Sequence, residues 1–594
     1  MTRSYSARIL NAFVLFLFAA CFLLRLFVWK LFPTAEAFLK EDIANLLVSA
    51  LVFFCAAVAF LRKYCSRERV EATGFEWPLG VLVLAAAFSI LYSVDTSIAI
   101  KATLALAAHV LLFYVAADIM GEERRIRIAF LIALAAALLT AFFGIREYYY
   151  LLHRVPAPGE ESLGRLNISL EYILLSKRVT SFLGWPNSLA GYLMLLFPAT
   201  GLMIIGFKNI WARIPLALAT LTLLLCYLFT FSFLGWTSLF LATLCLTPWL
   251  ADVFSFKRLS TAGKVFLTAG VVIFIGCFLV VISKKSFLSS LVPRVFYHKN
   301  VLKLILDQPF FGYGMNTFRV SSAKLIFTSN AYSAFVHNSY LQVWVEAGLV
   351  GFAALLAFVW KFVQCTRRTW AMTMLFNERL IFLGLTWGLA AFLIDNLYSF
   401  TLLKPNIGLF FWAHLGAWVA YARMIYLKQK KQSRHDKPAP QMRWPLLAGM
   451  VIAGVLCFFT GRLTLAMWDA HQAMQITRLE RMQQSLDLFN TAEELDPWDG
   501  KIPGYLGNRY IQIYRVTGKP KFLELAQAEF EEGVRRSPNV YDNYFLLSRV
   551  CRARGNGDCF TRADAMASRL FPFEYHNAVA EEARVAQAAA VKKP

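Results

Sequence analysis

A histidine stands where a long polar segment meets an apolar run, and its side chain could take part in acid–base chemistry there. His337 is followed by Asn338 and Gln342, and Glu346 comes about two helical turns farther on. An imidazole titrates near neutral pH, and placing an ionisable group beside hydrocarbon costs free energy that packing alone does not recover. His337 is therefore a candidate for chemistry, with Asn338, Gln342 and Glu346 as candidate supporting residues. A packing or helix-capping histidine is the alternative.

Basic side chains precede this histidine in two long polar segments. Arg178 lies in the first, and Lys284, Lys285 and Arg294 lie in the second. Such a group at one face of a membrane either anchors lipid headgroups or binds a phosphorylated substrate, because a planar guanidinium can hold phosphate oxygens bidentately. Both interpretations stay open on these residues alone. His298, close to Arg294, is the second choice for a base.

A turn separates Arg178 from the next apolar run. Trp185-Pro186-Asn187-Ser188 leads directly into that run. Asparagine and serine are favoured at the N-cap of a helix, so we expect Asn187 or Ser188 to be the N-cap. A plain helix start explains Pro186 and Asn187, but it does not explain Arg178 near the membrane surface.

The elements that position these residues are membrane helices. Of the 594 residues, 58% are hydrophobic and only 16% are charged, which is far more apolar than a soluble protein. The net charge of +23 falls in short clusters between apolar runs, so it indicates cytoplasmic loops rather than nucleic-acid binding. We predict an all-α, polytopic membrane protein of about 12–13 transmembrane helices. The spans begin near Ile9, Ala44, Trp77, Ile98, Arg127, Ser188, Trp211, Ser232, Val265, Tyr340, Leu380, Ile407 and Trp444.

Basic residues recur in alternate loops, starting with Arg3 and Arg8 before the first span. The positive-inside rule then places the N-terminus in the cytoplasm. The long loops at residues 146–187 and 284–339, and everything after residue 468, would lie outside. The first span is expected to be an uncleaved anchor. His109 and His414 lie inside spans and are expected to form internal hydrogen bonds.

The chain divides into four parts by composition. They are a membrane domain at 1–425, a basic cytoplasmic linker at 426–443, a last transmembrane helix at 444–468 and a helical outer domain at 469–594.

The outer domain carries a repeat signal. Ala526 and Phe530 followed by Pro538 match the tetratricopeptide pattern, and the 34-residue step from Pro538 to Pro572 equals the period of that repeat. Such helix pairs bind protein partners and carry no active site. An ordinary helical domain is the alternative.

Two cysteines of the outer domain, Cys551 and Cys559, are eight residues apart. An oxidising compartment permits a disulfide between them, and geometry decides whether one forms. No Cys/His set indicates a metal site.

Three motifs occur in a fixed order along the chain and carry a family resemblance. They are Arg178 with Gly184-x-Pro186-Asn187-Ser188-x-Ala190, then Asp307-x-Pro309-x-x-Gly312-x-Gly314, and finally His337-Asn338-Ser339-Tyr340-Leu341-Gln342 with Glu346-x-Gly348-x-x-Gly351. In this order the chain resembles the O-antigen ligase and polymerase superfamily.

The resemblance implies an inverting membrane glycosyltransferase of the C-type architecture that needs no metal or cofactor. Its donor would be a glycan on polyprenyl diphosphate, and its acceptor lipid A-core, a growing polysaccharide or a protein. Arg294 and Arg178 would bind the diphosphate and stabilise the charge of the leaving group, with help from Lys284 and Lys285. His337 would take the proton of the acceptor hydroxyl.

Further expectations follow from the same resemblance. Asn187 would support the site, and the enzyme would work at the outer face of a bacterial inner membrane, in contact with membrane lipids. Its repeats would offer a surface to a protein partner. A transporter is the other class with many spans, but it predicts charges at mid-membrane and internal repeats.

One position departs from the family pattern. Members commonly carry a Ser-Arg-Gly-type motif near the outer end of a span, and here Ser232-Phe233-Leu234-Gly235 stands in its place. The phenylalanine cannot hold a phosphate. Either Arg178 or a loop lysine supplies the charge, or the donor is bound differently.

Overall fold

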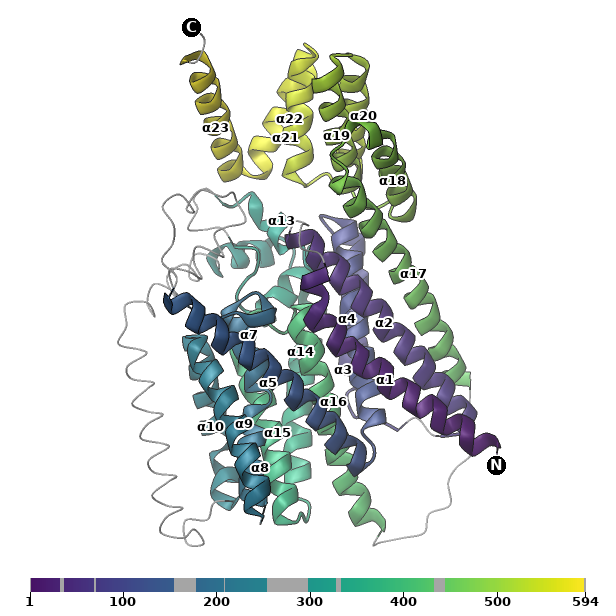
Figure 1. The fold of residues 1–594 in the computed structure, drawn as a ribbon, viewed down its shortest axis with the longest axis vertical. Coiled ribbons are helices and arrows are strands. Elements are labelled where there is room, and N and C mark those ends of the chain that lie inside the picture. Colours follow the sequence, from purple (N-terminus) through teal and green to yellow (C-terminus); the bar gives the residue numbers. More distant parts are fainter. Residues whose placement is uncertain are drawn as a thin grey trace.

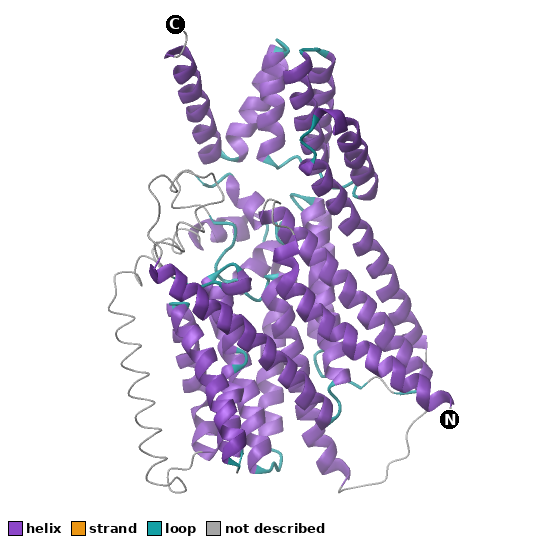
Figure 2. Ribbon diagram, viewed as in Figure 1, coloured by secondary structure: helices purple, strands orange, loops and turns teal. Residues whose placement is uncertain are grey.

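The computed structural model describes residues 2–31, 37–68, 71–153, 178–207, 209–253, 298–326, 333–431 and 444–591. Every regular element within these ranges is a helix, and none is a strand (Figures 1 and 2). This confirms the all-α prediction. The physical reason is that a helix satisfies its own backbone hydrogen bonds, which a chain crossing lipid must do.

The first half of the membrane domain consists of long helices followed by a broken span. The long helices are α1 (Thr2–Leu31), α2 (Ala37–Ser66), α3 (Glu76–Ser89), α4 (Thr96–Ile119) and α5 (Glu123–His153). Next come α7 (Pro186–Met194), α8 (Phe197–Gly206), α9 (Ile210–Phe229) and α10 (Phe233–Val253).

The second half carries the third motif. Its helices are α13 (Phe318–Ala323), α14 (Ser339–Trp370), α15 (Phe376–Asp395), α16 (Pro405–Lys431) and α17 (Trp444–Gln475). A further helical stretch at 298–307 ends immediately before Gln308-Pro309.

Nine helices of the described chain are long and apolar enough to cross a membrane, and the segments Ile9–Leu24 and Glu76–Tyr92 are shorter apolar helices. The protein is therefore a multi-pass membrane protein. The span predicted near Val265 lies outside the described residues.

The bundle is built from helix pairs that are distant in sequence. α17 packs along α2, and α16 packs along α4. Large aromatic side chains fill the middle of the bundle, and Trp412, Trp418 and Phe411 are among those fully buried. Figure 1 shows α17 continuing out of the bundle into the C-terminal helices.

The C-terminal domain consists of shorter helices. They are α18 (Met482–Leu495), α19 (Lys501–Thr517), α20 (Lys521–Arg536), α21 (Tyr541–Ala553), α22 (Gly557–Leu570) and α23 (Pro572–Val591). Ala526 and Phe530 are fully buried and share one core with Leu547 and Cys551. This packing agrees with a repeat domain, whose tetratricopeptide identity stays a prediction.

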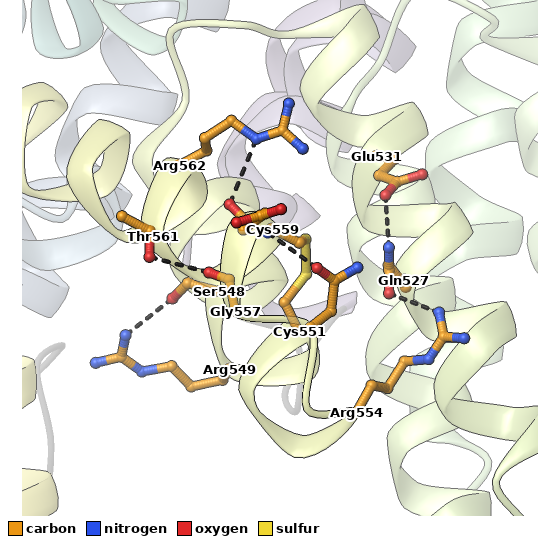
Figure 3. The surroundings of a disulfide bond; sticks show 12 residues. Gln527, Glu531, Ser548, Arg549, Cys551, Arg554, Gly557, Cys559, Thr561 and Arg562 are labelled. Carbon is orange, nitrogen blue, oxygen red and sulfur yellow. Dashed lines mark hydrogen bonds between the residues drawn. A yellow bond between two sulfur atoms is a disulfide. The ribbon is translucent and has the colours of Figure 1, made fainter.

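A disulfide joins Cys551 of α21 to Cys559 of α22, and their Cα atoms lie 5.7 Å apart. Figure 3 shows the bridge between these two helices, with Arg554 reaching Gln527 of α20 nearby. The sequence left open whether these two cysteines form a disulfide, and in the structure they do.

Candidate active site

His337 immediately precedes the N-cap of α14. Asn338 is the cap, and its side-chain oxygen accepts hydrogen bonds from the backbone N–H groups of Tyr340 and Leu341 at 3.0 and 3.1 Å. His337 has a φ of 56°, an uncommon value for a residue with a side chain. Its half-buried ring packs edge-on against Phe400, with 4.9 Å between the ring centroids. The histidine is therefore held at the start of a membrane helix.

Gln342 connects this histidine segment to Glu346. Its Nε2 donates to Glu346 Oε1 at 3.0 Å, and its Oε1 accepts from the backbone N–H of Val336 at 3.3 Å. Glu346 is only 1% exposed. The pair thus fixes the residue directly before His337. Gln342 and Glu346 support the histidine through its backbone.

A break inside α14 explains the glycine of the third motif. Gly348 has a φ of 71° and interrupts the helix. The carbonyl groups of Val345 and Glu346 instead accept hydrogen bonds from the backbone N–H groups of Tyr313 and Gly314, at 2.8 and 3.0 Å. The second and third sequence motifs are therefore one structural unit.

Close backbone contact makes this unit depend on glycine. A Cβ atom on Gly348 would lie 2.0 Å from the carbonyl oxygen of Phe310. Gly312 and Gly314 also have positive φ values, of 71° and 96°. Glycine adopts such a backbone readily because it has no Cβ atom.

Arg178 lies close to the Ser232-Phe233-Leu234-Gly235 segment. Its Nε donates to the backbone carbonyl of Thr230 at 2.8 Å, and its Nη2 donates to Asn187 Oδ1 at 2.8 Å. The same oxygen of Asn187 accepts from the hydroxyl of Ser232 at 3.1 Å. Arg178 and Ser232 therefore meet at one carboxamide, and Ser232 is followed directly by Phe233.

The N-cap predicted at Asn187 or Ser188 is wrong. α7 begins at Pro186, and Trp185 occupies the N-cap position without a side-chain hydrogen bond. Proline suits the first helical position because the missing N–H would have no partner there. The side chain of Asn187 instead binds Arg178 and Ser232, a role that a plain helix start does not require.

Sequence reasoning missed Lys404, which joins the first and third motifs. The residue is 3% exposed and precedes α16. Its Nζ lies 5.2 Å from the ring centroid of Trp185 and 5.3 Å from those of Phe335 and Phe400. Phe400 is also the ring that His337 contacts. The signal available in the sequence was a single lysine between two apolar runs.

The start of α14 is anchored to the end of α15. The backbone N–H of Ser339 donates to the carbonyl of Asn396 at 2.9 Å, and its hydroxyl donates to Asn396 Oδ1 at 2.7 Å. The same Oδ1 accepts from the backbone N–H of Leu402 at 2.8 Å. Asn396 thus ties the histidine segment to the loop that carries Lys404.

Three predicted cations, Arg294, Lys284 and Lys285, lie outside the described residues. The second-choice base, His298, is half-buried at the start of the 298–307 helix. His109 and His414 form internal hydrogen bonds, as predicted. Their Nε2 atoms lie 3.2 Å from the carbonyl oxygen of Pro405 and 3.3 Å from that of Leu385, respectively.

An all-helical membrane bundle with Arg178, Lys404 and His337 joined at one end defines a membrane protein with a cationic, histidine-bearing site. Residues 179–356 match the family model described as O-antigen ligase. That segment is similar to the O-antigen ligase family, and the match supports a membrane glycosyltransferase of the ligase and polymerase type at the level of the family. No curated protein matches the chain, and no solved structure does.

Proposed function

We propose that the protein transfers a glycan from a polyprenyl-diphosphate-linked donor to an acceptor hydroxyl. The observation that carries the proposal is the junction of the first and third motifs. Lys404 contacts the rings of Trp185 and Phe400, and Phe400 contacts His337. Trp185 is two residues from Asn187, which holds Arg178. Permanent positive charge and a titratable imidazole are thereby connected through adjoining side chains.

This arrangement suits a single displacement at the anomeric carbon. The acceptor oxygen forms a bond to that carbon as the bond to the diphosphate oxygen breaks, and the configuration inverts. His337 accepts the hydroxyl proton, because a group that titrates near neutral pH can act as a base at ambient pH. The diphosphate leaves with the bonding electron pair, and cations stabilise the charge that develops on it.

Arg178 is our choice for a diphosphate ligand among the described residues. Its two hydrogen bonds, to Thr230 and Asn187, fix the plane of the guanidinium, and a fixed plane favours bidentate contact with phosphate oxygens. Its place beside Ser232 supports the view that it supplies the charge missing at Phe233. Lys404 adds a second cation, and Arg294, Lys284 and Lys285 are proposed to complete the site from the second loop.

The reaction is proposed to take place at the outer face of a bacterial inner membrane, with the N-terminus in the cytoplasm. Two observations support this topology. The Cys551–Cys559 disulfide is typical of an oxidising compartment such as the periplasm. Figure 1 shows α1 beginning at the end of the bundle away from the C-terminal domain.

The acceptor is either lipid A-core, a growing polysaccharide or a protein hydroxyl. The buried Ala526 and Phe530 core of a repeat-like C-terminal domain favours a protein as acceptor or as assembly partner, because such helix pairs present surfaces to other proteins.

The test is to delete the gene in its native host and to measure surface glycoconjugates and lipid-linked precursors. We expect one glycoconjugate to disappear while its polyprenyl-linked precursor accumulates, and the wild-type gene to reverse both effects. The His337→Ala gene should reverse neither effect. The His298→Ala gene, which removes the second-choice base, should reverse both. Full complementation by His337→Ala at equal protein level would refute the assignment of the base.

A further inference from the structure

A buried charge cluster joins the C-terminal domain to the membrane domain. Lys101, near the start of α4, has its Nζ 2.8 Å from Asp496 Oδ2 and 2.6 Å from Asp499 Oδ2. The three side chains are only 12%, 1% and 6% exposed. Both acids lie in the turn between α18 and α19. Removing one partner of such a buried pair leaves an uncompensated charge, so the cluster strongly fixes the docked position.

The pKa of Asp499 agrees with a charged pair. Burial alone would raise the pKa of this carboxyl, but the Lys101 ammonium, helped by Lys501, outweighs burial and lowers it to about 2. Asp499 also accepts a hydrogen bond from the backbone N–H of Lys501 at 2.9 Å, which ties the carboxylate to the first turn of α19.

A second contact reaches the candidate active site through one residue. The side-chain amide of Asn539, in the turn between α20 and α21, donates to the carbonyl oxygen of Val94 at 3.1 Å. The backbone N–H of the same Val94 donates to the carbonyl oxygen of Tyr313 at 3.1 Å. Val94 therefore lies directly between the C-terminal domain and the loop of the second motif.

The contacts continue from that loop to the histidine. Tyr313 donates its N–H to Val345 in the break of α14, and Gly314 donates its N–H to Glu346. Glu346 accepts from Gln342, and Gln342 accepts from the N–H of Val336, which precedes His337. The loop also packs tightly on the segment just before α4, because a Cβ on Gly314 would lie 2.2 Å from the hydroxyl of Ser93.

We propose that the C-terminal domain positions His337, and that Asn539 and the Lys101–Asp496–Asp499 cluster are positioning residues for the transfer reaction. The proposal rests on the proposed role of His337. A histidine with a left-handed backbone persists only when its surroundings over-determine it, and the structure supplies this restraint through Val94. A partner that pulls on the C-terminal domain would then alter turnover without touching the substrate.

The test compares Asn539→Ala with the control variant Gln527→Ala. The side-chain amide of Gln527 forms its hydrogen bonds with Glu531 and Arg554, which both belong to the C-terminal domain. Hydrogen exchange of the amides of Tyr313 and Val336 is measured on the purified full-length protein. Initial transfer rates are measured in membranes of the deletion strain, which contain the accumulated donor, at saturating and limiting donor.

Asn539→Ala should raise exchange at both amides and lower the saturated rate by up to about fivefold, the effect of one ordinary hydrogen bond, with the donor KM unchanged. Gln527→Ala should change neither quantity. Unchanged exchange and rate in Asn539→Ala would overturn the inference.

The charge cluster supplies a second, stronger perturbation. Lys101→Met should shift the equilibrium between the docked and undocked C-terminal domain toward the undocked state by about a hundredfold or more, and it should slow transfer accordingly. The triple variant Lys101→Met, Asp496→Asn, Asp499→Asn carries no unpaired charge and should recover most of the rate. If Lys101→Met undocks the domain while transfer and exchange at Val336 stay as in wild type, the inference fails and the proposed function stands. Failure of the proposed function would appear instead as transfer by His337→Ala.

Discussion

Replacing Gly348 by alanine should disable the site without a direct contact to any proposed substrate group. Gly348 has a φ of 71°, and a Cβ there would lie 2.0 Å from the carbonyl oxygen of Phe310. The backbone of Gly348, with a φ of 71° and a ψ of −173°, lies in a region that is nearly exclusive to glycine and would cost an alanine roughly 1–3 kcal/mol. The clash is with backbone, so a side-chain rotation cannot relieve it.

The loop of the second motif must therefore move away from α14. That movement breaks the hydrogen bonds from Tyr313, Gly314 and Leu349 that hold the loop to the break in α14. At about 1 kcal/mol for each hydrogen bond, these losses and the strain add to about 4–6 kcal/mol. Such a penalty is comparable to the whole stability of many domains, so the loop should detach locally rather than stay in place.

The assay is hydrogen exchange of the Tyr313 and Gly314 amides, together with transfer activity at equal protein level. Gly454→Ala and Gly461→Ala are matched controls, because a Cβ at either position of α17 would meet nothing within 4 Å. In a helix interior this change should be neutral or stabilising by up to about 1 kcal/mol. If Gly348→Ala keeps the exchange protection and activity of these controls, the motif unit does not position His337.

Three further predictions address the cations and the C-terminal domain. Lys404→Met should lower transfer at least tenfold, whereas Lys404→Arg should keep part of the activity, because arginine retains the charge and can still stack on aromatic rings; initial rates at equal protein level decide this. Asn187→Ala should weaken the hold on Arg178 by about 1.5–3 kcal/mol, the usual value for a hydrogen bond to a charged group, and a donor titration should show a raised KM; an unchanged KM would contradict the proposed role of Arg178. Burial, together with the neighbouring Glu493, raises the pKa of Glu529 from 4.5 to about 7, so the folded domain holds this proton more tightly than the unfolded chain does. The contribution of protonated Glu529 to the stability of the domain should be fully present below about pH 4.5 and should be lost as the pH rises through 7. Glu529→Gln should remove that pH dependence, measured as hydrogen exchange of α20 amides corrected for intrinsic rates. An equal pH dependence in both proteins would contradict this.

The sequence predicted the class of fold well because the signals are local. Apolar runs give the spans, and the spacing of Ala526 and Phe530 identifies a buried helix face in the C-terminal domain. These properties depend on each residue and its near neighbours, so a single sequence contains them.

The details of the site were less predictable, because they depend on partners distant in sequence. Asn187 looked like a helix cap, and only the fold brings Arg178 and Ser232 to its side chain. Gly348 lies within an apolar run that predicts an unbroken helix, and its break depends on a loop more than 30 residues upstream. Lys404 belongs to no motif, and its surroundings come from Trp185 and Phe335 in two other segments.

The most direct test of the central claim is the rate of glycan transfer by His337→Ala under saturating donor in membranes of the deletion strain. The KM of the variant for the donor should be unchanged. Its transfer rate should be about 10²- to 10⁴-fold lower than that of the wild type, which is the usual contribution of a general base. A rate within about twofold of the wild type, at equal protein level, would contradict the role of His337.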